Sequence, residues 1–137
     1  MQIIAYAASV PKNRLLAGRI MSGLPALFLL LDGAMKLMKP EPVIRGTVEL
    51  GYPESVIVPL GILLLACTVL YLIPRTAVLG AILLTGYLGG AVATHVRVGQ
   101  WPFEILFPVA FGVLLWGGLV ARDDRLGALI PLRNRPR

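Results

Sequence analysis

The stretch Ser55–Ile73, SVIVPLGILLLACTVLYLI, contains no charged residue and decides the structural class of this chain. Three more apolar runs of the same length lie at about residues 20–38, 76–94 and 102–120. An α-helix of that length is about 28 Å long, close to the ~30 Å hydrocarbon core of a bilayer. The chain is 57% hydrophobic and only 15% charged, so the four runs predict an integral membrane protein with four spanning helices.

We therefore expect an all-α, up-down-up-down four-helix bundle within residues 20–120. Residues 1–19 are interpreted as an N-terminal interfacial segment and residues 121–137 as a basic tail. The first ten residues, MQIIAYAASV, have no basic stretch before their apolar part, which is unlike a cleavable signal peptide. The domain organisation predicted is one membrane domain with two short flanks.

The charged residues predict the orientation of the bundle. With four spans, both termini and the connection around Arg75 lie on one side of the membrane and carry nine Lys and Arg residues. The opposite side receives four. The positive-inside rule places the nine in the cytoplasm, which predicts a multi-pass protein of a bacterial inner membrane with both termini inside. The basic pI of 10.1 then reports topology and contact with membrane lipid, and it requires no nucleic-acid partner.

The longest connection between spans, residues 39–54, reads KPEPVIRGTVELGYPE. Val43, Thr47 and Leu50 recur at helical spacing, which predicts a short interfacial or re-entrant helix followed by a turn at Gly51-Tyr52-Pro53. Such a helix either covers the outer mouth of the bundle or only tethers two spans.

Asp32 lies within span one, only about 4–5 Å beyond the midplane if the span is centred near Leu29. A carboxylate at that depth costs ~2.5 kcal/mol or more, so it needs a partner or a polar cavity. Lys36, one helical turn further out, is spaced to form that pair. The two residues either neutralise each other or line a ligand pocket.

The only histidine, His95, ends span three on the same outer side. Glu104 lies across a short connection from it, in the first turn of span four, where helix capping alone explains a carboxylate. A histidine and a carboxylate at one level also form a feasible proton-exchanging pair. Arg97 and Trp101 are placed at this level as further candidate ligand-binding residues.

Span three carries small residues at helical spacing, among them Gly86, Gly90 and Thr94. Such a stripe allows neighbouring helices to approach closely, inside the chain or at the seam of a homo-oligomer, but it also leaves room for a flat ligand. Tyr87 lies beside it, four residues before Ala91 and eight before His95, so its hydroxyl needs an acceptor inside the bundle.

Several kinds of site find little support in the sequence. The single cysteine, Cys67, lies in mid-span and is interpreted as a small packing residue. One histidine and scattered carboxylates do not predict a metal site, and neither a CxxC pair nor a phosphate-binding glycine loop is present. No cofactor is therefore predicted apart from a bound quinone as one possibility.

Three segments resemble one family: GAMKLMKP in span one, ELGYPES before span two, and LIPRTAVLGAILLTGYLGGAVATHVRVG through span three, within the four-span pattern. They are similar to the DoxX-like family over about residues 33–120. The resemblance implies a small bacterial four-helix membrane bundle, with relatives linked to thiosulfate:quinone oxidoreductase and to resistance against quinone or catechol stress. It supplies no catalytic residue for this chain.

Three functions are considered. The first is a binding or accessory protein whose outer half holds a small, flat, apolar molecule such as a quinone, in service of a redox or stress-resistance system. Its polar end would be oriented by Asp32, Lys36, Tyr87, His95, Arg97, Trp101 and Glu104. The second is an isomerase or quinone-linked oxidoreductase, with His95, Glu104 and Asp32 as candidate catalytic residues. The third, a small proton-coupled transporter, fits less well because the charge bias fixes a single orientation.

Overall fold

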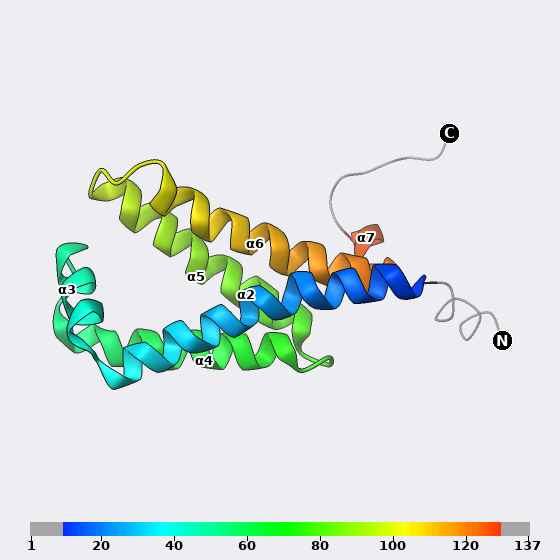
Figure 1. Cartoon of the computed structure of the whole chain (residues 1–137), viewed down its shortest axis with the longest axis horizontal. Helices are drawn as coiled ribbons and strands as arrows, with labels where there is room; N and C mark the ends of the chain where they lie inside the picture. Colours follow the sequence, from blue (N-terminus) through cyan, green and yellow to red (C-terminus); the bar gives the residue numbers. More distant parts are fainter. Residues whose placement is uncertain (1–9, 130–137) are drawn as a thin grey trace.

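The computed structural model describes residues 10–129, and these form a helical bundle without strands in that range. Four long helices run along the molecule: α2 (Lys12–Met38), α4 (Ile57–Leu72), α5 (Ala77–Arg97) and α6 (Phe103–Arg122). A short helix, α3 (Glu41–Glu49), and a 3-10 turn, η1 (Glu54–Val56), connect α2 to α4, and α7 (Asp124–Leu129) follows α6. Figure 1 shows α3 at one end of the bundle and α7 at the other.

The helix boundaries follow from local chemistry. Lys39 adopts the left-handed conformation and ends α2, and Pro40 and Pro42 place the chain at the start of α3. Gly51, at φ +87°, makes the turn after α3 that an ordinary residue would resist. Each of the four long helices, α4 with its η1 turn included, is long and apolar enough to cross a membrane. The four-helix all-α membrane bundle predicted from the sequence is confirmed.

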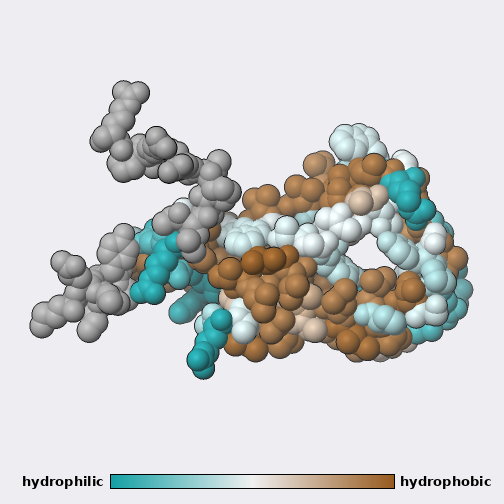
Figure 2. Space-filling model, turned by 180° about the vertical axis from the view of Figure 1, so that it is seen from behind, coloured by the Kyte–Doolittle hydropathy of each residue, from teal (hydrophilic) through white to brown (hydrophobic). Residues whose placement is uncertain are grey.

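Each long helix packs against two others, in the cyclic order α2, α4, α5, α6. At the end where α7 lies, the buried side chains of Leu64, Tyr71, Leu84 and Leu115 fill the centre. Toward α3 the pair α2 and α4 diverges from the pair α5 and α6 (Figure 1). The face drawn in Figure 2 is largely apolar, and exposed large apolar side chains occur on all four long helices, as a lipid-facing surface requires.

A buried polar network holds the α7 end together. The Tyr71 hydroxyl, fully buried on α4, lies 2.6 Å from the Leu115 carbonyl on α6 and 2.7 Å from Ser22 Oγ on α2. Arg122 donates to Ser22 Oγ from the end of α6, at 3.0 Å. Three helices are thus joined at one level, which keeps this end closed while the other end opens.

The described parts of the predicted flanks are helical. Helix α2 begins at Lys12, so residues 12–19 are continuous with residues 20–38; segment 1–9 lies outside the described residues, and the interfacial place of residues 1–19 stays a prediction. Part of the predicted tail forms α7, which Arg14 holds through an ion pair with Asp124 at 2.5 Å. The predicted tail residues 130–137 also lie outside the described part.

Candidate ligand pocket

A cavity of about 690 Å³ occupies the bundle between the diverging helix pairs at the α3 end. Its wall is formed by α2, α3, α5 and α6, with Leu60 from α4. The polar residues of the wall are Asp32, Lys36, Thr47, Glu49, Tyr52, Tyr87, Thr94, His95, Gln100 and Glu104. Figure 2 shows the hollow as an opening through the space-filling surface near this end. Five of the seven residues predicted as ligand-binding therefore line one cavity.

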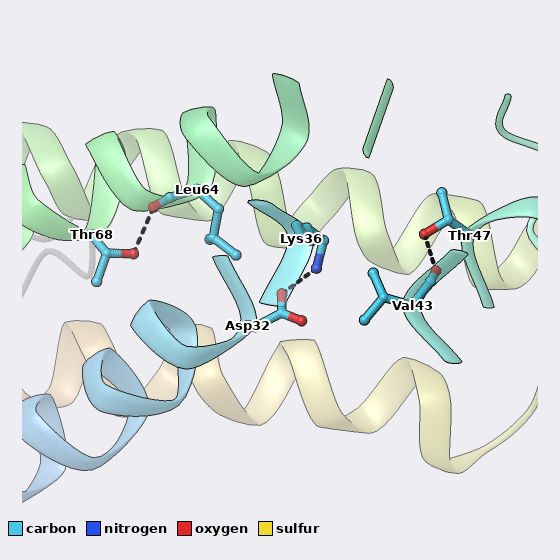
Figure 3. A network of polar contacts seen from close by, with 6 residues as sticks. All are labelled: Asp32, Lys36, Val43, Thr47, Leu64 and Thr68. Atoms are coloured by element: carbon cyan, nitrogen blue, oxygen red, sulfur yellow. Dashed lines mark hydrogen bonds and ion pairs between the residues drawn. The ribbon is translucent and has the colours of Figure 1, made fainter. Parts of the chain in front are cut away.

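Asp32 and Lys36 form the ion pair that their spacing predicts. The Lys36 ammonium donates to Asp32 Oδ2 across one turn of α2 (Figure 3). The Lys36 side chain is only 16% exposed because it passes close to Gly61 of α4, while that of Asp32 remains 34% exposed toward the cavity. Pair formation and cavity lining, posed as alternatives from the sequence, thus occur together.

His95 is oriented by Gln100, which was not among the predicted site residues. Its Nδ1 lies 2.5 Å from the Gln100 side-chain oxygen. An amide oxygen only accepts, so this hydrogen bond requires the tautomer that carries the proton on Nδ1, in which Nε2 can accept a further hydrogen bond. Glu104 lies on the same cavity wall, yet no hydrogen bond joins it to His95. The proposed His95/Glu104 exchange pair is therefore not formed directly in this structure.

Tyr87 and Glu104 bring unused hydrogen-bonding capacity to the cavity. Within residues 10–129, neither the Tyr87 hydroxyl nor the Glu104 carboxylate has a side-chain hydrogen bond or ion pair. Tyr87 was expected to need an acceptor inside the bundle, and it instead reaches a hollow. A phenol can donate and a carboxylate can accept, so this wall can satisfy both kinds of polar group on a ligand.

An aromatic wall faces these polar groups. Phe28 on α2 lies edge-on to Phe107 and Phe111 of α6, with ring centroids 5.4 and 5.0 Å apart. Phe103 extends the row along α6. Sequence analysis missed this wall, although the four-residue spacing of Phe103, Phe107 and Phe111 indicates one helical face. Aromatic rings of this kind accept flat or hydrocarbon groups.

The segment Glu41–Pro53, here called the strap, closes the end of the cavity. Helix α3 contributes Val43 and Thr47 to the wall (Figure 3). The strap is fixed to α5 at two points: Tyr52 donates to Thr94 Oγ1 at 2.8 Å, and Arg97 donates to the Leu50 carbonyl at 2.5 Å. The predicted short helix with its following turn is confirmed, and it covers the mouth as well as tethering two spans.

The glycine stripe of α5 does not mediate close helix packing. Side chains added at Gly86 and Gly90 would meet nothing within 4 Å, and both glycines line the cavity. Close approach occurs instead at Gly80, which touches the backbone of α4, and where Gly33 of α2 meets Gly61 of α4. Inside the described chain, Gly86 and Gly90 border open space and not a neighbouring helix, whereas the homo-oligomer seam stays a prediction.

Two predicted residues lie outside the cavity wall. Arg97 points to the strap and holds it through Leu50, so its place in the structure is that of a fastening residue. Trp101 is 72% exposed beside the α5–α6 connection, a position typical of an interfacial aromatic residue. Cys67 is buried in α4, in keeping with the packing role expected of it.

Comparison with known proteins gives one clear result. The model of the DoxX-like family matches residues 20–118, which include α4, α5 and the strap in full and most of α2 and α6. No curated protein and no solved structure shows significant similarity to the chain. The match spans most of the sequence, and the chain belongs to the DoxX-like family.

Proposed function

We propose that this protein binds a small, flat, largely apolar molecule such as a quinone in the cavity beneath the strap. The observation that carries the proposal is that the cavity has an aromatic wall and a polar wall. Phe28, Phe107 and Phe111 form the first, and the second includes Tyr87 and His95. Pockets for small ligands combine an apolar lining with a few placed polar groups in this way.

The polar groups suit both redox forms of a quinone headgroup. The Tyr87 hydroxyl can donate to a quinone carbonyl, and a hydroquinone hydroxyl can donate to His95 Nε2 or to Glu104. Binding would break no existing hydrogen bond, because none of these three polar atoms has another partner among the described residues. This supports a role as a binding or accessory protein of a redox or stress-resistance system.

We also propose that the strap faces the outside of a bacterial inner membrane. Lys12, Arg14 and Arg19 lie near the beginning of α2, and Arg122 and Arg125 near the end of α6, so these five cations gather at the α7 end. An excess of Lys and Arg marks the cytoplasmic side. The cavity then lies in the outer half of the bilayer.

The test compares thermal stabilisation by a panel of short-chain quinones and their reduced forms in detergent. Binding to the native state raises the unfolding temperature as ligand concentration exceeds Kd. Gly90→Trp fills the cavity without a clash at its Cβ, and Gly23→Trp, equally free of neighbours but far from the cavity, is the matched control. We expect stabilisation in the wild type and Gly23→Trp only. Equal stabilisation in Gly90→Trp refutes binding at this site.

An enzyme remains the second candidate, favoured by His95 Nε2 and Glu104 lining one cavity. Proton transfer between a bound ligand and these groups would require His95. In that case turnover is lost in His95→Ala while ligand-dependent stabilisation persists. If the wild-type protein shows no turnover with any quinone of the panel, the enzyme proposal fails and only ligand binding is left.

A further inference from the structure

The cavity is covered by the strap at its α3 end and is open between the helices at its sides. The strap crosses its end and is fastened to α5 by Tyr52 and Arg97. Along the sides, α2 and α6 diverge on one face of the bundle and α4 and α5 on the other (Figure 1). The opening visible in Figure 2 lies between the helices beside the strap, so it passes through the bundle sideways.

The two side openings have different chemistry. The α2/α6 edge carries Phe28, Phe103 and Phe107, which line the cavity and are also 45%, 69% and 39% exposed at the surface. The α4/α5 edge carries Gly86 and Gly90, and the strap is fastened on that side. No hydrogen bond or ion pair of the described residues fastens the strap to α6. The α2/α6 edge is thus aromatic and lies away from the fastened side of the strap.

We infer that the cavity is filled from the bilayer through the α2/α6 edge, by an amphiphile whose hydrocarbon tail lies against the exposed faces of Phe28 and Phe107, in contact with the surrounding lipid. The inference rests on the proposed ligand site and defines its ligand class. The polar end of the molecule lies against Tyr87, His95 and Glu104, and its tail leaves sideways. A water-soluble headgroup without a tail lacks the concentrating effect of the membrane and the added contacts of a tail with Phe28 and Phe107.

Charge is consistent with a ligand that is not anionic. The wall holds the carboxylates Asp32, Glu49 and Glu104 against the single ammonium of Lys36. An anionic headgroup would be repelled at short range in a region of low dielectric constant. A neutral, hydroxyl-bearing or carbonyl-bearing end meets no such penalty.

The route is tested by fluorescence quenching in nanodiscs. A bimane label is attached to an Ala91→Cys variant in a Cys67→Ala background, because Ala91 lines the cavity. Two nitroxide quenchers are compared: one carried high on a phosphatidylcholine chain and one confined to water by a trimethylammonium group. The second is cationic, so the carboxylates of the wall do not exclude it. Labels at Gly23→Cys, on the lipid face, and at Glu41→Cys, on the exposed side of α3, calibrate the two quenchers.

We expect the Ala91→Cys label to be quenched several-fold more by the lipid-borne nitroxide than by the water-confined one. Phe28→Ala should raise the lipid-borne quenching, and Leu60→Ala, the matched truncation of a lining residue on α4, should raise it less. Predominant quenching from water overturns the lateral route. A larger increase in Leu60→Ala than in Phe28→Ala overturns the choice of edge. The label reports without any quinone, so either failure is separate from a failure of quinone binding.

Discussion

Gly80 and Gly86 lie on the same helix, yet the structure assigns them opposite tolerance of a methyl group. A Cβ at Gly80 would lie 2.5 Å from Tyr71 Cα and 2.8 Å from the Leu70 carbonyl carbon, whereas one at Gly86 meets nothing within 4 Å. Carbon atoms pack at about 3.5 Å or more, so Gly80→Ala must push α4 and α5 apart by about 1 Å. The obstacle is backbone and cannot rotate away.

We expect Gly80→Ala to lower the free energy of unfolding by about 1–3 kcal/mol relative to Gly86→Ala, the range typical of overpacking. The comparison between the two variants cancels the helix propensity of alanine over glycine, which is ~1 kcal/mol in water. Unfolding in mixed SDS micelles, followed by circular dichroism, gives the difference. If the two variants have equal free energies of unfolding, the contrast between a close backbone contact at Gly80 and open space at Gly86 is wrong.

Three further outcomes follow from the same contacts. Asp32→Ala leaves the largely buried Lys36 side chain without its carboxylate partner and should destabilise the protein by about 1–3 kcal/mol, more than the double variant with Lys36→Met does; the reverse order would mean that the pair is solvated. Tyr71→Phe removes the hydroxyl that joins three helices and should cost about 1 kcal/mol, within the range for hydrogen bonds in membrane bundles, as measured by the same unfolding assay. Gly51→Ala forces an alanine to φ +87° and brings its Cβ to 2.9 Å from Arg97 Nη2, so hydrogen exchange in α3 should accelerate while that of α6 stays unchanged.

The sequence predicts the fold class well, and also the depth of each residue along its span, because the length and hydropathy of the apolar runs determine both. The four spans and the short helix with its turn follow from composition and periodicity. The spacing of Asp32 and Lys36 predicts their pairing because both lie on one helix.

What could not be predicted depends on how the helices diverge. Whether the glycine stripe of α5 meets a neighbour or an empty space is decided by the angle between helix pairs, which the stripe does not encode. The role of Gln100 was missed because a loop amide has no distinctive pattern, and its bond to His95 depends on the folded α5–α6 connection. Arg97 lies at the same depth as the cavity, yet its side chain donates to the Leu50 carbonyl and so holds the strap to α5.

The central claim is that a ligand occupies the hollow between the diverging helix pairs. The direct measurement is a cryo-electron microscopy structure of the protein in native-lipid nanodiscs, with native mass spectrometry of the same preparation. Our account predicts an elongated density touching Phe28, Tyr87 and His95, with a bound mass matching a neutral amphiphile. A bundle in which α2 and α6 close against each other, or in which Asp32 faces lipid with the hollow filled by side chains, would contradict it.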